Sequence, residues 1–132
     1  MTKIIQTWGR RKSAIARVTL NHGKGIVRVN KKRIETLSHE LAKLRMQEPL
    51  LLSGETMQGV SIDVDVHGGG TSSQADAVRL GIARALAEHD KKLEKVFLSY
   101  DRTLLVADVR YKETHKPNRH GKARAKRQKS YR

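Results

Sequence analysis

The sequence predicts an α+β domain in which one mixed or antiparallel sheet packs against helices, followed by an extended basic C-terminal tail. Three observations predict this fold. Apolar and polar residues alternate as in strands early in the chain, apolar residues recur with helical spacing later, and no large aliphatic residue follows Val109. The chain has 132 residues, the length of one domain. We expect a globular body over residues 1–109 and a cationic tail over residues 110–132.

The strand signals lie mainly in the first half of the body. Lys3–Thr7 is a short extended stretch, and Ser13–Leu20 carries apolar side chains at every second position. The segment Asn21–Gly25 contains two glycines and predicts a turn, so that Ile26–Val29 would return as the second strand of a hairpin. Val60–His67 is the clearest strand, because valine or isoleucine occupies every second position.

A short helix is expected to begin at Ser38, a residue that commonly caps helices. Its inward stripe would include Leu41, Leu44 and Met46. Pro49 should stop or redirect this helix, because proline disfavours helical geometry in the residue before it.

The longest predicted helix runs from Thr71 to about His89 and follows the glycine triplet Gly68–Gly70. Its apolar residues lie three or four positions apart, as on one face of a helix. A second short helix is expected over Lys91–Leu98. The inward face of the long helix would consist of Ala75, Val78, Ile82 and Leu86.

Positive charge is concentrated at one end of the chain. The chain has 28 Lys and Arg against 13 Asp and Glu, a net charge of +15. Residues 110–132 contain ten of these cations and one acid, Glu113, which leaves +6 for the body. The cations of the tail repel one another unless a polyanion neutralises them. Extended at ~3.3 Å per residue, such a tail spans up to roughly 75 Å.

Several classes of function are excluded or disfavoured. The chain has no cysteine, which rules out disulfides, zinc–thiolate sites and thiol catalysis. No apolar run approaches the ~20 residues that a membrane span needs, and we expect no secretory signal. Asp63 and Asp65 share a strand face, but a solvated face is favoured strongly over an acid pair or a metal site. We expect no catalytic residue, no cofactor and no metal.

The glycine triplet Gly68–Gly70 admits three interpretations. It can be a simple strand-to-helix turn, which we favour, or a contact with polynucleotide phosphate, which is nearly as plausible. A mononucleotide pocket is the least favoured, because the lysine and spacing of the known phosphate-binding loops are missing. Two other functions stay open as alternatives. One is a small-molecule kinase that uses Gly68–Ser73, and the other is a free-standing DNA-compacting protein.

Two further basic clusters lie in the body. Arg10, Arg11 and Lys12 precede a predicted strand, so their position should be fixed. For Lys31–Arg33 a solvated surface is as good an explanation as a binding role. No helix is rich in base-reading residues, which argues against a reader of double-stranded DNA. The basic tail instead favours RNA, where Tyr131 could stack on a base.

Ordered motifs extend over nearly the whole chain. The first is Gly9-Arg10-Arg11-Lys12-Ser13-Ala14. Others follow at Glu48–Leu52, Val66–Gly70, Gln74–Ala75, Ile82–Leu86, Tyr100–Asp108 and Gln128–Arg132. In these motifs the chain resembles the ninth small-subunit ribosomal protein family, in its archaeal and eukaryotic-cytosolic branch, and is most similar to archaeal members. It departs from the family pattern at Tyr111, where a second basic residue is usual.

The resemblance implies a ribosomal β-α-β domain embedded in the rRNA of the small-subunit head, in the cytoplasm, beside neighbouring head proteins. It also implies that the tail reaches the anticodon stem-loop of the peptidyl-site tRNA, and that the protein is no enzyme. By this resemblance, rRNA contact falls to Arg10, Arg11, Lys12, Gly68, Gly69, Gly70, Arg110, Lys116, Arg119, Lys122, Arg124, Lys126 and Arg127. Contact with tRNA falls to Lys129, Tyr131 and Arg132.

Overall fold

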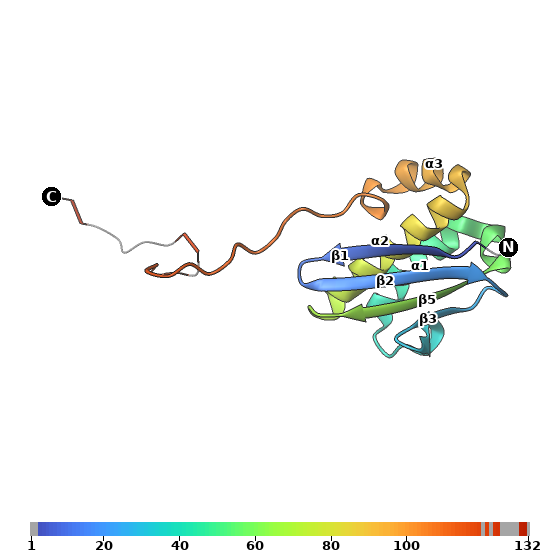
Figure 1. The fold of residues 1–132 in the computed structure, drawn as a ribbon, viewed down its shortest axis with the longest axis horizontal. Coiled ribbons are helices and arrows are strands. Elements are labelled where there is room, and N and C mark those ends of the chain that lie inside the picture. Colours follow the sequence, from blue (N-terminus) through green and yellow to red (C-terminus); the bar gives the residue numbers. More distant parts are fainter. Residues whose placement is uncertain (1–2, 120, 122, 125–129, 132) are drawn as a thin grey trace.

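The computed structural model describes residues 3–119, 121, 123–124 and 130–131. Within them, a five-stranded sheet is covered on one face by helices (Figure 1). The predicted α+β class, with one mixed sheet packed against helices, is confirmed. The strands are β1 (Ile5–Arg11), β2 (Ala14–His22), β3 (Val27–Val29), β4 (Lys32–Arg33) and β5 (Val60–His67). The helices are α1 (Glu40–Ser53), α2 (Thr71–His89) and α3 (Lys91–Tyr100), with short 3-10 turns η1 (Ile34–Thr36), η2 (Gly54–Gly59) and η3 (Arg102–Leu104).

The strand order is β1-β2-β5-β3-β4, which corrects one sequence prediction. The hairpin expected between the strands around Asn21–Gly25 does not form, because β5 lies between β2 and β3. The backbone of that loop explains the difference. The N–H groups of Gly23 and Gly25 donate to the carbonyls of Gly59 and Val60 instead of pairing back onto β2. The loop is thereby held against the start of β5, and β3 pairs in parallel with β5.

A tight turn joins β3 and β4 at Asn30 and Lys31, whose φ angles are +50° and +67°. Two successive left-handed residues are typical of the turns that match the twist of a two-stranded hairpin. Asn30 also binds β5: its side-chain oxygen accepts a hydrogen bond from the N–H of Val66 at 2.9 Å. The basic cluster Lys31–Arg33 thus lies at the β4 edge of the sheet.

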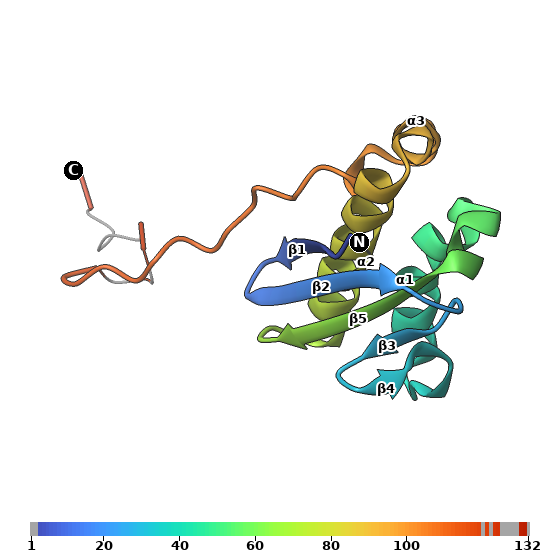
Figure 2. The same ribbon diagram turned by 45° about the vertical axis from the view of Figure 1, so that its right-hand side comes forward.

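The two faces of the sheet differ, as the alternation predicts. Helix α2 packs on one face, and α1 and α3 flank it on the same side of the sheet (Figure 2). The inward face of α2 is buried at all four predicted positions, Ala75, Val78, Ile82 and Leu86. The sheet residues buried beneath it include Ala14, Ala16, Val18, Leu20, Val60, Ile62, Val64 and Val66. No helix covers the other face of the sheet among the described residues.

Strand β1 and helix α2 approach each other closely at two glycines. A Cβ on Gly9 would collide with the carbonyl oxygen of Ala77 and would lie 2.7 Å from the backbone nitrogen of Gly81. A Cβ on Gly81 would lie 2.6 Å from a methyl carbon of Val18. The hydroxyl of Thr7 donates to the carbonyl of Gly81 at 2.9 Å, which fixes the strand along the helix. Glycine is therefore required at this crossing by space.

Helix α1 differs from its prediction in three respects. It begins after His39, whose ring nitrogen accepts from the N–H of Ala42, and it continues through Pro49 to Ser53. Pro49 is buried on the inward face, and this packing offsets the hydrogen bond that proline cannot donate. Leu41 and Leu44 were expected to point inward but are exposed, whereas Met46, also expected there, is buried together with Ala42.

The guanidinium of Arg79 connects helix α2 to α1 and to η3. It donates to Glu48 of α1 at 2.6 Å, to Asp101 at 3.1 Å and to Thr103 at 3.2 Å. Its side chain is only 13% exposed, whereas those of Glu48 and Asp101 are 33% and 39% exposed. The pKa of Asp101 is lowered, chiefly by hydrogen bonds from Thr103 and also by the one from Arg79. Helix α2 is thus tied to α1 and η3, which orients the chain as it leaves the body.

We predict that Gly9→Ala lowers the free energy of unfolding by about 1–3 kcal/mol, the usual cost of overpacking. The strand would have to move away from α2 to accommodate the methyl group. Chemical denaturation monitored by circular dichroism measures this cost. Gly59→Ala is the matched control, because a Cβ at Gly59 meets nothing within 4 Å. Equal stabilities of the two variants would contradict the close approach.

Candidate nucleic-acid interface

The candidate interface begins at the turn between β1 and β2. The turn residue Lys12 has a φ of +53° and is exposed. Arg10 and Arg11 end strand β1, where they pair with Ile15 and Ala14 of β2. Because successive residues in a strand point to opposite faces, these two arginines have different surroundings.

Arg11 points toward the helices and is only 19% exposed. Its guanidinium lies 3.8 Å from the carboxylate of Asp76 in α2 and 3.3 Å from that of Asp108. Arg45 of α1 also contacts Asp76, at 3.2 Å. Arg11 was predicted as an RNA contact, and the structure places it in an intramolecular ion-pair network instead of on the open surface.

Asp108 connects the body to the start of the tail. It accepts hydrogen bonds from the side chain of Arg110, at 2.7 Å for the shortest, and from the N–H of Arg110 at 2.9 Å. These hydrogen bonds, together with the nearby charge of Arg11, hold the pKa of Asp108 well below its ordinary value. One carboxylate therefore holds an arginine of β1 and an arginine of the tail together.

Arg10 points to the uncovered side of the sheet and also contacts the tail. Its guanidinium lies 4.6 Å from the centre of the Tyr111 ring, within the range of a cation–π interaction. Its Nε also donates to the carbonyl of Lys12 at 3.4 Å. Tyr111, at which the sequence departs from the family pattern, thus has a partner on β1.

These contacts bring residues 10–12 and 110–112 together around one hollow of about 580 Å³. It is lined by five cations, Arg10, Arg11, Lys12, Arg110 and Lys112, which we call the root cluster, and by Ser13 and Tyr111. No acidic residue is among the described residues that line it. Such a concentration of one sign of charge attracts anions and raises their local concentration.

The glycine triplet lies against the same turn. Gly68 and Gly69 have φ angles of +76° and +65°, which favour glycine. A Cβ on Gly68 would lie 2.5 Å from the carbonyl oxygen of Ser13, so the loop also needs little bulk. Gly70 has no such restriction, since its φ is −102° and a Cβ there would meet nothing within 4 Å. The turn interpretation accounts for Gly68 and Gly69.

The described part of the tail has no helix or strand, and it runs away from the body past the β1–β2 turn (Figure 1). Glu113 accepts from Lys116 and, at 2.6 Å, from Arg124, and both contacts lower its pKa. Arg119 and Tyr131 are exposed. The predicted binding residues Lys122, Lys126, Arg127, Lys129 and Arg132 lie outside the described residues.

The described residues show no other candidate centre for chemistry. No group of three His, Asp or Glu side chains among them could hold a metal ion. Asp63, weighed as part of an acid pair, lies 3.8 Å from Arg28. No helix in this part of the chain is long and apolar enough to cross a membrane.

Three residues that line the hollow were not predicted as binding residues, namely Ser13, Tyr111 and Lys112. The partner of Tyr111 is Arg10, about a hundred positions earlier in the chain, so no local pattern indicates this pairing. The signal available in the sequence was the presence of two basic segments, Arg10–Lys12 and the tail, far apart in the chain. That signal reports charge and does not report which residues meet.

We predict that the contacts between Asp108 and Arg110 persist at pH 3.8, the ordinary pKa of aspartate. A lowered pKa means that the interaction is present above the ordinary value and is lost only as the pH falls through the depressed value. NMR titration of the Arg110 amide should give a midpoint below 3.8. Asp108→Asn should abolish this titration, whereas Asp90→Asn at the other end of the body should leave it unchanged. A midpoint at or above the ordinary value would contradict the arrangement.

Comparison with known proteins gives the family. A family model described as ribosomal protein S9/S16 matches residues 9–132. The small ribosomal subunit protein uS9 of Methanococcus vannielii is 48% identical over 133 aligned positions, which cover 98% of this chain and 99% of the relative. The proteins of the same name from Methanococcus maripaludis strains C7 and C5 are 47% identical with the same coverage. The chain therefore belongs to the S9 family of ribosomal proteins, in its archaeal-like branch, and is a ribosomal protein and not an enzyme.

Proposed function

We propose that this chain, a ribosomal protein of the small subunit by its family, binds rRNA in the subunit head and reaches the peptidyl-site tRNA with its tail. Its location is then the ribosome in the cytoplasm, and other head proteins are its neighbours. The observation that carries the proposal is the root cluster, in which cations from β1 and from the start of the tail surround one hollow.

The geometry of the root cluster suits a phosphate backbone. Arg10, Lys12 and Arg110 are exposed, and positive charge on neighbouring elements can neutralise successive phosphates of one strand. Arg11 is committed to Asp76 and Asp108, so we assign it a positioning role within the cluster. The loop Gly68–Gly70 allows a close approach of backbone beside this cluster, and we include it in the proposed rRNA surface.

We further propose that residues 110–132 act as an arm and residues 1–109 as the body that docks it. The Asp108 contacts and the Arg10–Tyr111 contact give the arm its direction at the root. Its length, up to roughly 75 Å when extended, allows contact far from the docking surface. Tyr131 is 87% exposed and offers a ring that can stack on a base. Lys129 and Arg132 are the proposed phosphate contacts beside it.

Salt titration of binding to the cognate small-subunit rRNA tests the rRNA proposal. The slope of log K against log salt should be about −0.7 for each single-strand phosphate neutralised. Arg10→Gln combined with Lys12→Gln should therefore reduce its magnitude by about 1.4, and deletion of residues 110–132 should reduce it further. The matched control is Lys91→Gln with Lys95→Gln on α3, which should leave the slope within error. An unchanged slope in the first variant and in the deletion would refute the proposed surface.

Removal of Ser130–Arg132 tests the tRNA proposal separately. We predict that small subunits still assemble with the shortened chain, because the body and most of the arm are retained. The affinity of the peptidyl site for tRNA should fall severalfold, as measured by filter binding on purified subunits. Subunits with Lys91→Gln serve as the control. Unaltered tRNA affinity, or failure of assembly, would contradict this division of roles.

A further inference from the structure

The uncovered face of the sheet carries the only tryptophan of the chain. Trp8 lies in the edge strand β1 and is 54% exposed. Its neighbour Thr7 points to α2, whereas Trp8 points away from the core. A half-exposed indole on a sheet face that no helix covers is an aromatic surface available to a ligand.

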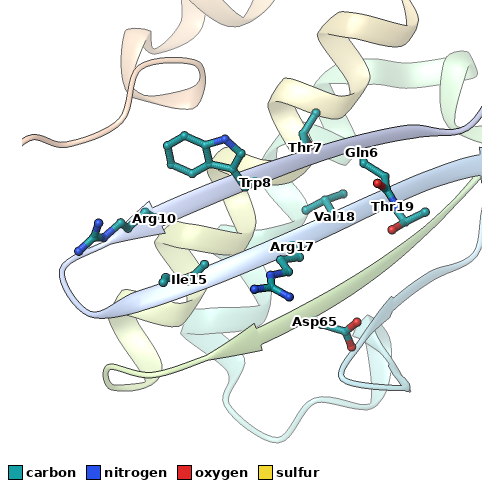
Figure 3. A pocket seen from close by; sticks show the side chains of 9 residues that line it. All are labelled: Gln6, Thr7, Trp8, Arg10, Ile15, Arg17, Val18, Thr19 and Asp65. Atoms are coloured by element: carbon teal, nitrogen blue, oxygen red, sulfur yellow. The ribbon is translucent and has the colours of Figure 1, made fainter.

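Trp8 borders a broad hollow of about 730 Å³ on this face (Figure 3). The hollow extends over three neighbouring strands, with Arg10 from β1, Ile15 and Arg17 from β2, and Asp65 from β5. Among the described residues that line it, these two arginines are the basic ones and Asp65 is the acidic one. The hollow thus combines an aromatic ring and two arginines with the uncharged polar side chains of Gln6, Thr7 and Thr19.

The side chain of Arg84, from α2, contacts the indole ring of Trp8. Its guanidinium lies 4.9 Å from the centre of the Trp8 ring. The same guanidinium donates to the carbonyl of Trp8 at 3.1 Å and to that of Leu105 at 3.2 Å. Arg84 is thus anchored to β1 and to the segment after η3, and the ring is supported before any ligand arrives. Because the ring is already held in place, a base that stacks on it pays a smaller entropic cost for ordering the side chain.

We propose that this face binds an unpaired base of RNA, with the base stacked on Trp8 and the adjoining phosphates held by Arg10 and Arg17. Stacking on an exposed aromatic residue beside basic side chains is a general way to hold single-stranded nucleic acid. The inference rests on the proposed rRNA binding and adds to it the kind of RNA element and the surface that receives it.

Two observations favour RNA over a protein partner. First, Arg10 lines both this hollow and the root cluster, so the two surfaces are continuous and one strand can cross from one to the other. Second, three guanidinium groups, those of Arg10, Arg17 and Arg84, surround Trp8 and suit phosphate, and they outnumber the one carboxylate beside Trp8 and Arg84, that of Glu88. Asp65 of β5 lies directly opposite Arg17 of β2 in the sheet and so limits the site on that side.

Fluorescence of the single tryptophan tests the proposal directly. The full chain is titrated with a 12-nucleotide oligouridylate and, separately, with a duplex RNA of the same length, while total binding is followed by gel mobility shift. We expect the oligouridylate to quench the emission of Trp8 in proportion to binding and to protect it from acrylamide. The duplex should bind without this quenching, because its bases are already stacked and paired.

Variants separate stacking from general charge. Trp8→Ala should weaken binding of the oligouridylate about tenfold, within the range expected for loss of one stacked base. Trp8→Phe should stay within about threefold of the parent, and Arg17→Gln should weaken binding severalfold. Arg28→Gln is the control on the same sheet face, where the arginine is paired with Asp63, and it should stay within about twofold. Thermal melts confirm that each variant folds.

The outcomes distinguish this inference from the proposed function. Intact RNA binding with unchanged Trp8 emission would overturn the stacking site and leave the rRNA proposal standing. Equal weakening of oligouridylate and duplex binding by Trp8→Ala would overturn it as well. If neither the oligonucleotides nor the cognate rRNA bind at all, the proposed function itself fails. If a purified head protein protects Trp8 from acrylamide and RNA does not, the face binds a protein and the inference is overturned.

Discussion

The close approach of β1 to α2 at Gly9 and Gly81 is the constraint on which the rest of this structure depends. With no side chain at either position, the strand lies directly on the helix, and its register cannot shift without a collision. That register decides the direction of every side chain in β1. Trp8 and Arg10 face the uncovered side, whereas Arg11 faces α2 and its acidic partners. Two glycines thus determine which side chains of β1 lie on the open face and which pack against the body.

Acidic residues orient the basic ones in this protein. Exposed ion pairs contribute little to stability individually, about 0–1 kcal/mol each. Here their importance is geometric: Asp76 and Asp108 hold Arg11, Asp108 holds Arg110, and the tail therefore leaves the body beside the β1–β2 turn. Without such contacts, the repulsion among the cations would favour their separation. A few carboxylates allow a strongly basic chain to present its charge at a defined place.

The candidate site was predictable in its charge but only partly in its geometry. The sequence indicated Arg10–Lys12 and the basic tail as binding segments, and the structure brings Arg10, Lys12 and Arg110 to one hollow. Arg11 lies inside an ion-pair network, and Gly68 and Gly69 have a conformational explanation of their own. Trp8 was not recognised, because the predicted first strand ended at Thr7 and so gave Trp8 no face. Tyr111 was not recognised, because its partner Arg10 lies about a hundred positions earlier in the chain.

Local periodicity by itself determined β5, α2 and the buried face of each, since Val60–His67 and Thr71–His89 have the bounds that alternation and helical spacing predict. The distribution of charged residues along the chain determined that positive charge is concentrated after Asp108. Only the tertiary structure decided the strand order, in which β5 separates β2 from β3, and the continuation of α1 through Pro49. Periodicity reports which side of an element is buried, because burial repeats with the geometry of that element. Pairing between distant strands depends on backbone hydrogen bonds and on packing, which leave no repeat in the sequence.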